Sequence, residues 1–326
     1  DTIGTVQIQA TATGYTATSV NMQVTQPKFT LNVNPTLYTT SAPGYITVYA
    51  TDANGNVHPV NADLTVTLLS SAPSVAGIDS TSVTIVANNY YSTAARWVPG
   101  TVGTAQLSAS DDRAIRYPYG LATANVAVQV PPASLGIFNE SLGLGQYIDT
   151  YVSIPNTPAS AVTVPLGHAA TPTTTTPASV VIPNTTSYVY FRLSGTTTGL
   201  DTITASPPNH VPAVGTVNVA PGIISPLNGW PSALAVGDSA LITLYTRSPN
   251  GGAIRPVLAA TTFALGSNAN IVFVSGGSTI TSAVVPADAY YVQFYVKGVT
   301  AGSGNTTITN ANYVTYTNSL SVSSPP

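Results

Sequence analysis

Charge is scarce in this chain and cysteine is absent. Of 326 residues, 8 are Lys or Arg and 11 are Asp or Glu, which makes 6% charged and a net charge of −3; an average soluble domain is roughly 25% charged. So few basic residues argue against nucleic-acid binding, because phosphates need a basic face. Glu140 is the single glutamate, and long exposed helices normally depend on Glu, Lys and Arg.

The other absences concern cross-links and membranes. A secreted protein without cysteine is stabilised by its cores alone. No apolar run approaches the roughly 18–20 residues of a membrane span, so we expect no membrane span. The chain begins at Asp1 with no signal-peptide pattern, and we expect it to be either processed or part of a longer protein.

Thr, Ser, Val, Ala, Asn, Tyr, Gly and Pro replace the missing charge. Thr, Val and Tyr favour half-buried strands, whereas Gly, Pro and Asn favour turns. A hydrophobic content of 44% is too high for a disordered chain of low charge. The composition therefore predicts an all-β protein.

A short motif occurs four times, about a hundred residues apart: 4-GTVQIQAT-11, 103-GTAQLSAS-110, 199-GLDTITAS-206 and 304-GNTTITNA-311. The residue four positions after each glycine is aliphatic, namely Ile8, Leu107, Ile203 and Ile308. Apolar and polar residues alternate around it, which is typical of a strand with one face in a core. Asp201 interrupts the pattern, because it falls on the inner face.

The sequence around the motif repeats as well. An aromatic-rich run and a glycine turn precede the last three copies, and a short strand ending at proline follows all four. Short strands with regular turns, in units of about a hundred residues, are typical of β-sandwiches. We therefore predict tandem Ig-like sandwiches at 28–131, 132–220 and 221–326. Residues 1–27 are predicted to be the last hairpin of an incomplete fourth domain, or a donor strand segment.

One part of the chain resembles a known family. The run 47-TVYATDANGNVHPVNADLTVTL-68 is similar to the front strands of bacterial Ig-like repeats, including those of intimin and invasin stalks, and 82-SVTIVANN-89 through 103-GTAQLSAS-110 resembles their back half. The second and third predicted domains lack DANGN and carry 155-PNTPAS-160 and 247-RSPNGG-252 instead. The resemblance implies a tandem-domain stalk on a cell surface and implies no active site.

The residues that could support catalysis are few. His58, His168 and His210 occupy different places in the repeat, and we interpret each as a surface-loop residue. No GxSxG elbow is present, and the adjacent acids Asp111 and Asp112 precede Arg113, which suggests a solvated turn with local ion pairing. The sequence therefore predicts a protein that is not an enzyme and has no cofactor.

Two kinds of weaker site remain open. Asp52, Asn54 and Asn56 have the spacing that opens some calcium loops, but the twelfth position is Asp63 and not the usual glutamate, and Asn54-Gly55 is also a standard hairpin dipeptide. We favour a turn there and keep calcium as the minor alternative. Asn139, Asn184 and Asn305 begin N-x-S/T sequons, so they are candidates for N-linked glycans. The stretch 171-TPTTTTP-177 is either an O-glycosylated segment or a flexible loop.

Aromatic strands supply candidate interfaces. In 290-YYVQFYV-296, alternation places Tyr291 and Tyr295 on one face and Tyr290, Val292 and Phe294 on the other, which we assign to the core. The tyrosine face is predicted to pack against a neighbour rather than to bind carbohydrate. The apolar face of the first hairpin is the second candidate interface: Val6, Ile8, Val20, Met22 and Val24.

Two functions follow from these features. The favoured one is a structural protein outside the cell: a filament subunit, stalk or surface-layer segment that associates with further copies or with Ig-like domains of a longer chain, by strand complementation through 1–27 if Asp1 is the mature terminus. The alternative is an adhesin or carbohydrate-binding module that uses tyrosine faces or end loops. Fold alone cannot separate them.

Overall fold

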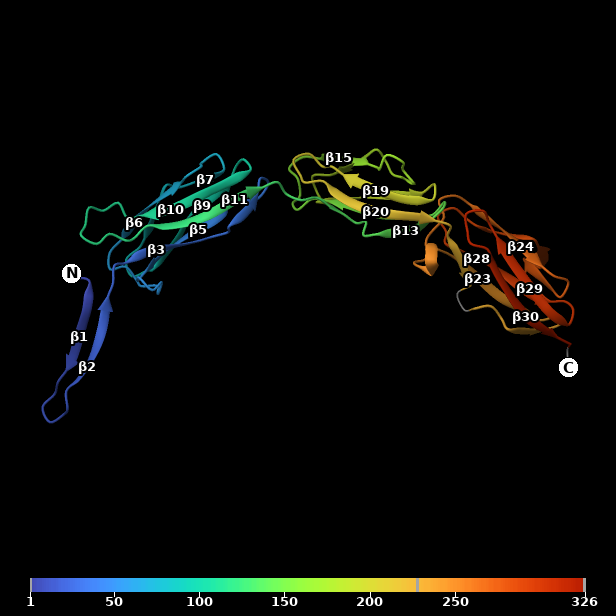
Figure 1. Ribbon diagram of the computed structural model, residues 1–326, viewed down its shortest axis with the longest axis horizontal. Helices are drawn as coiled ribbons and strands as arrows, with labels where there is room; N and C mark the ends of the chain where they lie inside the picture. The colour runs from blue at the N-terminus through green and yellow to red at the C-terminus, as the bar shows by residue number, and fades with distance from the viewer. Residues whose placement is uncertain (1, 227–228, 325–326) are drawn as a thin grey trace. The chain divides into compact units, whose positions relative to one another are not determined.

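A computed structural model describes residues 2–226 and 229–324 and divides the chain into two compact units, 1–131 and 132–326. Asp1 lies outside the described residues, as do Pro325 and Pro326, the prolines at which the last strand is predicted to end. The chain is all-β, as predicted: tandem sandwiches preceded by an N-terminal hairpin (Figure 1). A single turn of 3₁₀ helix, η1 (Pro249–Gly251), interrupts the strands of the described part. No helix there is long and apolar enough to cross a membrane.

The hairpin and the first sandwich form the first unit. The hairpin is a two-stranded sheet of β1 (Gly4–Ala10) and β2 (Thr18–Val24). One sheet of the sandwich has the order β3 (Lys28–Val33), β5 (Gly44–Thr51), β9 (Tyr91–Pro99), β7 (Ala76–Ile78). The other has the order β4 (Thr36–Tyr38), β11 (Ala122–Gln129), β10 (Gly103–Ser110), β6 (Leu64–Ser70), β8 (Ser82–Ile85).

The second unit begins with the second sandwich, in which the same arrangement recurs. Its first sheet is β12 (Ser134–Leu135), β14 (Tyr147–Ser153), β18 (Tyr188–Gly195), β16 (Thr174–Thr175). Its second sheet is β13 (Glu140–Gly143), β20 (Ala213–Ala220), β19 (Gly199–Ala205), β15 (Val162–Gly167), β17 (Ser179–Ile182).

The third sandwich completes the second unit. Its first sheet is β21 (Ile223–Pro226), β23 (Ser239–Arg247), β28 (Tyr291–Gly298), β25 (Ile271–Ser275), β26 (Ser278–Ile280). Its second sheet is β22 (Ala233–Ala235), β30 (Tyr316–Ser323), β29 (Gly302–Thr309), β24 (Thr261–Ser267), β27 (Ser282–Val285).

The strand order explains the Ig-like appearance of the sequence. In each sandwich the first sheet has the strand order A-B-E-D, namely β3-β5-β9-β7, β12-β14-β18-β16 and β21-β23-β28-β25, and β26 extends the third of these sheets. The second sheet places G and F beside C, namely β11-β10-β6, β20-β19-β15 and β30-β29-β24, as in Ig domains. A short strand near the N-terminus, A′, runs parallel to the last strand, G; β4 does so beside β11, β13 beside β20 and β22 beside β30. The four motif strands are therefore β1, β10, β19 and β29, and three of them are F strands.

The alternating pattern of the motif has the predicted effect in the three sandwiches. Leu107, Ile203 and Ile308 are buried in three separate hydrophobic clusters of the described residues. The fourth copy is displaced from its predicted position: Gly302, not Gly304, has the conformation and pairing of the other motif glycines. A shift of two residues keeps the inner and outer faces unchanged, so the face assignment holds. The predicted limits at 28–131, 132–220 and 221–326 stay predictions.

A matched pair of substitutions tests this description. Leu107→Ala opens a cavity in the first core and is expected to lower the free energy of unfolding by about 2–5 kcal/mol. Ile8 is at the same position of β1 and is exposed in the described chain. Ile8→Ala is therefore expected to change the free energy of unfolding by no more than about 0.5 kcal/mol. Urea unfolding of dilute protein measures both values, and equal losses would contradict the description.

Candidate functional site

The N-terminal hairpin presents a row of apolar side chains to solvent. Val6 pairs with Met22 and Ile8 pairs with Val20 across β1 and β2. All four are exposed large hydrophobic residues, and Val24 is half-buried. Covering an aliphatic side chain of this size contributes about 1.5–3 kcal/mol, so the face favours a partner.

The same positions are buried in the first sandwich. Ile8 is 49% exposed, whereas Leu107 at the equivalent place of β10 is 1% exposed. Met22 is 49% exposed, whereas Val126 on β11 is 2% exposed. β10 and β11 lie side by side in the first unit (Figure 1) with β6 and β4 on their outer edges. In the part of the chain that the structure describes, β1 and β2 have no such neighbouring strands.

The backbone geometry of the hairpin matches that of the F–G pairs in the three sandwiches. The motif glycine pairs with a valine in all four copies: Gly4 with Val24, Gly103 with Val128, Gly199 with Val219 and Gly302 with Val322. The φ angles of these glycines are 148°, 156°, 140° and 139°, a region that residues with a Cβ rarely adopt. The outer face matches too, since Gln7 pairs with Asn21 as Gln106 does with Asn125.

A second recurring surface consists of tyrosine pairs on the B and E strands. Tyr49 pairs with Tyr91 in the first sandwich, Tyr151 with Tyr190 in the second and Tyr245 with Tyr291 in the third. The ring centroids of these pairs are 6.0, 5.9 and 5.6 Å apart. Every pair has at least one exposed member, so each sandwich carries an aromatic patch on these strands. The first and third patches are equivalent in position, whereas Tyr151 and Tyr190 lie two residues farther along, because Ser153 and Tyr188 occupy the equivalent places.

The third patch is larger than the sequence predicts. Tyr291 and Tyr295 are exposed on β28, in agreement with the alternation. Tyr290, which alternation assigns to the core, is also exposed, because β28 begins one residue later and Tyr290 stacks on Tyr245 instead.

A buried amide joins the second and third sandwiches within the second unit. Gln146 has no exposed surface. Its Oε1 accepts from the Gly143 N–H at 2.9 Å, and its Nε2 donates to the Arg247 carbonyl at 2.9 Å and to the Tyr313 hydroxyl at 3.2 Å. The backbone of Gln146 also forms an antiparallel bridge with Val257. Burial raises the pKa of Tyr313 to about 12, so its hydroxyl stays protonated.

Charged and aromatic groups surround this amide. The Tyr147 hydroxyl donates to Asp288 at 2.8 Å, and Arg192 donates to the same Asp288 oxygen at 2.9 Å. The Arg192 guanidinium also lies 3.6 Å from the centroid of the Tyr147 ring. Hydrogen bonds from Tyr147 and Arg192 lower the pKa of Asp288. Together with the pair between Arg255 and Glu140, these contacts fix the junction, and nothing in the sequence repeat indicates them.

The predicted calcium candidates form a closed turn. Asp52 Oδ1 accepts from the N–H groups of Asn54 and Asn56 at 2.8 and 2.9 Å, and Oδ2 accepts from Asn56 Nδ2 at 3.0 Å. These hydrogen bonds, led by the Asn56 side chain, lower the pKa of Asp52 to about 2. Gly55 has a φ of 90°, which suits a tight turn. The described residues contain no group of three His, Asp or Glu side chains placed to hold a metal. Calcium binding here stays a minor, untested alternative.

The three sequon asparagines are exposed. Asn139 has a φ of 51° and accepts from the Thr216 hydroxyl at 2.7 Å. Asn184 follows β17 and Asn305 lies on the outer face of β29. All three are therefore accessible, and glycosylation stays a prediction.

Two other sequence interpretations are corrected by side-chain contacts. The expected local ion pair of Asp111 with Arg113 is present, but Asp111 is not solvated: its carboxylate is fully buried and receives two hydrogen bonds of 2.7 Å from Arg113. Burial raises its pKa, but the hydrogen bonds from Arg113 and from the Tyr119 N–H outweigh burial, and the net pKa is lowered. His168 is not a free surface histidine either, because it contacts Asp201 and Thr176. His58 and His210 do lie at exposed or half-exposed loop positions.

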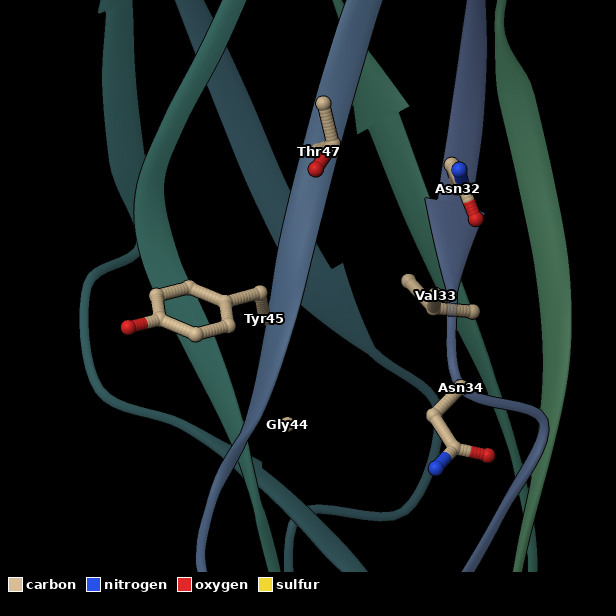
Figure 2. Close-up of a pocket in the computed structure, with 6 residues that line it drawn as sticks. All are labelled: Asn32, Val33, Asn34, Gly44, Tyr45 and Thr47. Atoms are coloured by element: carbon tan, nitrogen blue, oxygen red, sulfur yellow. The ribbon is translucent and has the colours of Figure 1, made fainter.

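A shallow hollow of about 340 Å³ lies on the outer surface of β3 and β5, between Asn32, Val33, Asn34, Gly44, Tyr45 and Thr47. Figure 2 shows the Tyr45 ring pointing away from Asn34, so the polar groups do not converge on one point. Ligand and active sites usually combine a concave pocket with converging polar groups. This hollow is therefore a weaker candidate than the recurring surfaces.

Asp201 provides a test of the electrostatics in the second sandwich. Burial raises its pKa, but hydrogen bonds from Thr174, His168 and Ala169 outweigh burial and hold the pKa at about 2, below the ordinary 3.8. A lowered carboxyl pKa stabilises the fold above about pH 4, and this stabilisation is lost as the pH falls toward 2. We expect the loss to be about 2 kcal/mol. Urea unfolding near pH 7 and near pH 2.5 should show a smaller acid-induced loss in Asp201→Asn; an unchanged loss would contradict this assignment.

Comparisons with known proteins find only low similarity to solved structures. No protein-family model matches the sequence, and no curated protein sequence does either. Bacterial adhesins are among the similar solved structures, as the resemblance in the sequence predicts. The match to the Escherichia coli adhesin FdeC has 14% identity and a TM-score of 0.26, and covers 92% of this chain and 97% of that one. The match to the Yersinia pseudotuberculosis adhesin InvE has 16% identity and a TM-score of 0.26, and covers 60% of each chain.

A surface-layer protein is similar as well. The match to domains 4–9 of SbsC has 16% identity and a TM-score of 0.30, and covers 91% of this chain. It covers 47% of that structure, so this chain spans about half its length. TM-scores and identities this low carry no inference about binding or assembly, and the β-sandwich assignment rests on the sheets of the chain itself.

Proposed function

We propose that this chain is part of a structural protein outside the cell, a filament, stalk or surface-layer component, in which β1 and β2 supply the F and G strands of a sandwich completed by other strands. The observation that carries the proposal is the exposure of Ile8 and Met22 in a hairpin whose equivalent in the first sandwich is buried. The similarity of glycine conformation and register supports it.

The missing neighbours follow from the complete sandwiches. Strand β1 needs an antiparallel C strand, as β6 is to β10, and β2 needs a parallel A′ strand, as β4 is to β11. Within the described residues, β1 and β2 form a two-stranded sheet by themselves. Open edges of a sheet attract further strands, and an isolated hairpin is marginal in water. Addition of strands to such edges combines main-chain hydrogen bonds with burial of the apolar face.

The source of the completing strands separates two forms of the proposal. In one, a second copy of the chain contributes them, which links copies into a filament. In the other, a preceding segment of the same polypeptide contributes them, which makes the chain one part of a longer stalk. The junction around Gln146 suits either form, because it holds consecutive sandwiches in a fixed arrangement.

Low charge and accessible sequon asparagines fit a structural role at a cell surface. Glycans at Asn139, Asn184 or Asn305 would cover a surface that has few charges to keep it hydrated. The cell-surface location and the glycans are parts of the proposal.

The two forms are tested with charge substitutions on opposite faces of the hairpin. Ile8→Asp and Met22→Asp place a carboxylate on the apolar face and should abolish association of the chain, because burying an unpaired charge is strongly unfavourable. Gln7→Asp and Asn21→Asp alter the outer face and should leave association intact. Sedimentation velocity at high concentration and electron microscopy measure the outcome.

Association that survives both apolar-face variants would refute strand complementation through the hairpin. A parent chain that stays monomeric at high concentration would refute the version with a second copy. In that case the hairpin should become protected from hydrogen exchange once the preceding segment of the polypeptide is present.

The tyrosine pairs favour a second candidate function, an adhesin or carbohydrate-binding module. Three aromatic patches, one on the B and E strands of each sandwich, present flat apolar rings with hydroxyl groups. A partner with a repeating chemical structure, such as a polysaccharide, offers repeated contacts of the same kind to such patches.

This alternative is tested by removing one ring from each pair. The variant with Tyr49→Ala, Tyr151→Ala and Tyr245→Ala should weaken binding to any polysaccharide retained by the parent by at least about tenfold, because central tyrosines contribute about 2 kcal/mol or more to interfaces. Tyr15→Ala, at the exposed tip of the hairpin, is the matched control. If the parent chain binds no polysaccharide on a glycan array, this candidate function is eliminated.

A further inference from the structure

Three features that the repeat does not explain meet at one end of the second sandwich. His168 directly follows β15, Thr176 directly follows β16, and Asp201 lies near the start of β19. His168 Nδ1 is 3.1 Å from Asp201 Oδ2, and His168 Nε2 is 2.9 Å from Thr176 Oγ1. The arrangement is an acid, a histidine and a hydroxyl in series, the geometry by which hydroxyl nucleophiles are activated.

The hydrogen-bond network determines which groups donate. The pKa of Asp201 is about 2, so its carboxylate is ionised at neutral pH and can only accept. His168 therefore carries its proton on Nδ1 toward Asp201, and in the neutral ring Nε2 is an acceptor. Thr176 Oγ1 is then the donor to Nε2, which is the direction of proton transfer that a general base requires.

Solvent exposure increases along the series from Asp201 through His168 to Thr176. The Asp201 side chain is fully buried, the His168 side chain is 20% exposed, and Thr176 is half-exposed. The orienting group is therefore shielded from water, whereas the hydroxyl remains accessible to a reagent. Burial also keeps the carboxylate fixed, since it accepts from the N–H groups of Ala169, Thr173, Thr174 and Thr202 and from the Thr174 hydroxyl.

The other repeats show that this group is not a requirement of the fold. The position of Asp201, two residues after the motif glycine, is Val6, Ala105 or Gly304 elsewhere. The position of His168 is Ser70 in the first sandwich and Ser267 in the third, according to the pairing with the F strand. Complete sandwiches therefore form without the carboxylate or the imidazole.

We propose that Thr176 is an activated nucleophile and the acyl-acceptor site of this chain, with activated carboxylic esters as its class of reagent. Thr176 Oγ attacks the ester carbonyl carbon, and a new Oγ–C bond forms while the bond from that carbon to the leaving alkoxide or phenoxide breaks. The hydroxyl proton passes to His168 Nε2 and then to the leaving oxygen. Asp201 orients the ring and stabilises its charged form, and the product is an O-acyl threonine plus an alcohol or phenol.

The test uses the full chain with p-nitrophenyl acetate and peptide mapping by mass spectrometry. General-base assistance contributes about 10²–10⁴-fold, so Thr176 should gain an acetyl group at least about 10²-fold faster than its neighbour Thr175, which has no such contact in the described structure. The chain has two lysines, Lys28 and Lys297; acetyl groups on their amines resist hydroxylamine, whereas the threonine ester is cleaved.

Matched variants separate activation from mere accessibility. His168→Gln keeps a polar side chain of similar length but has no base, and it should reduce acetylation at position 176 to the level of Thr175. Thr176→Ser should retain fast acetylation, and Thr175→Ala should leave Thr176 unaffected. Circular dichroism and urea unfolding confirm that each variant is folded. Equal rates at Thr175 and Thr176 in the parent, or an unchanged rate in folded His168→Gln, would overturn the proposal.

Discussion

The need to cover the apolar face of the F–G hairpin governs this structure. Each hairpin places aliphatic side chains on one face, and each sandwich covers that face with the opposite sheet and flanks it with C and A′ strands. The motif glycine, the valine opposite it and the register between them recur because this packing recurs. β1 and β2 have the same apolar face without the covering sheet, which explains why the hairpin is the strongest candidate for an assembly surface.

On this common scaffold lie features of two kinds. A tyrosine pair recurs on the B and E strands of every sandwich, at the same place in the first and third and two residues away in the second, and these pairs belong to the repeat. The amide of Gln146 and the group formed by His168, Thr176 and Asp201 occur once each, at positions where the other repeats have different residues. Features of the second kind cannot follow from the requirements of the fold, since complete sandwiches form without them.

Local pattern predicts much of the fold but little of the site. Period-two alternation placed Leu107, Ile203 and Ile308 in cores and predicted the strand pairs around them. It assigned Tyr290 to the core, because the pattern does not reveal that β28 begins at Tyr291. It treated Asp111 and His168 as solvated, because their partners are contributed by folding of loops whose geometry is not encoded in spacing. The inward position of Asp201 was the one visible signal, since a carboxylate on an inner face requires a compensating set of hydrogen bonds.

The buried amide of Gln146 has a consequence for how the second unit unfolds. Separating the second sandwich from the third would break the hydrogen bonds from Gln146 Nε2 to the Arg247 carbonyl and to the Tyr313 hydroxyl, and a hydrogen bond of this kind contributes about 0.5–1.5 kcal/mol. In a tandem array, the free energy of each contact between neighbours sets whether repeats unfold singly or together. This contact favours concerted unfolding, so the mechanical element of such an array would be a pair of sandwiches rather than one.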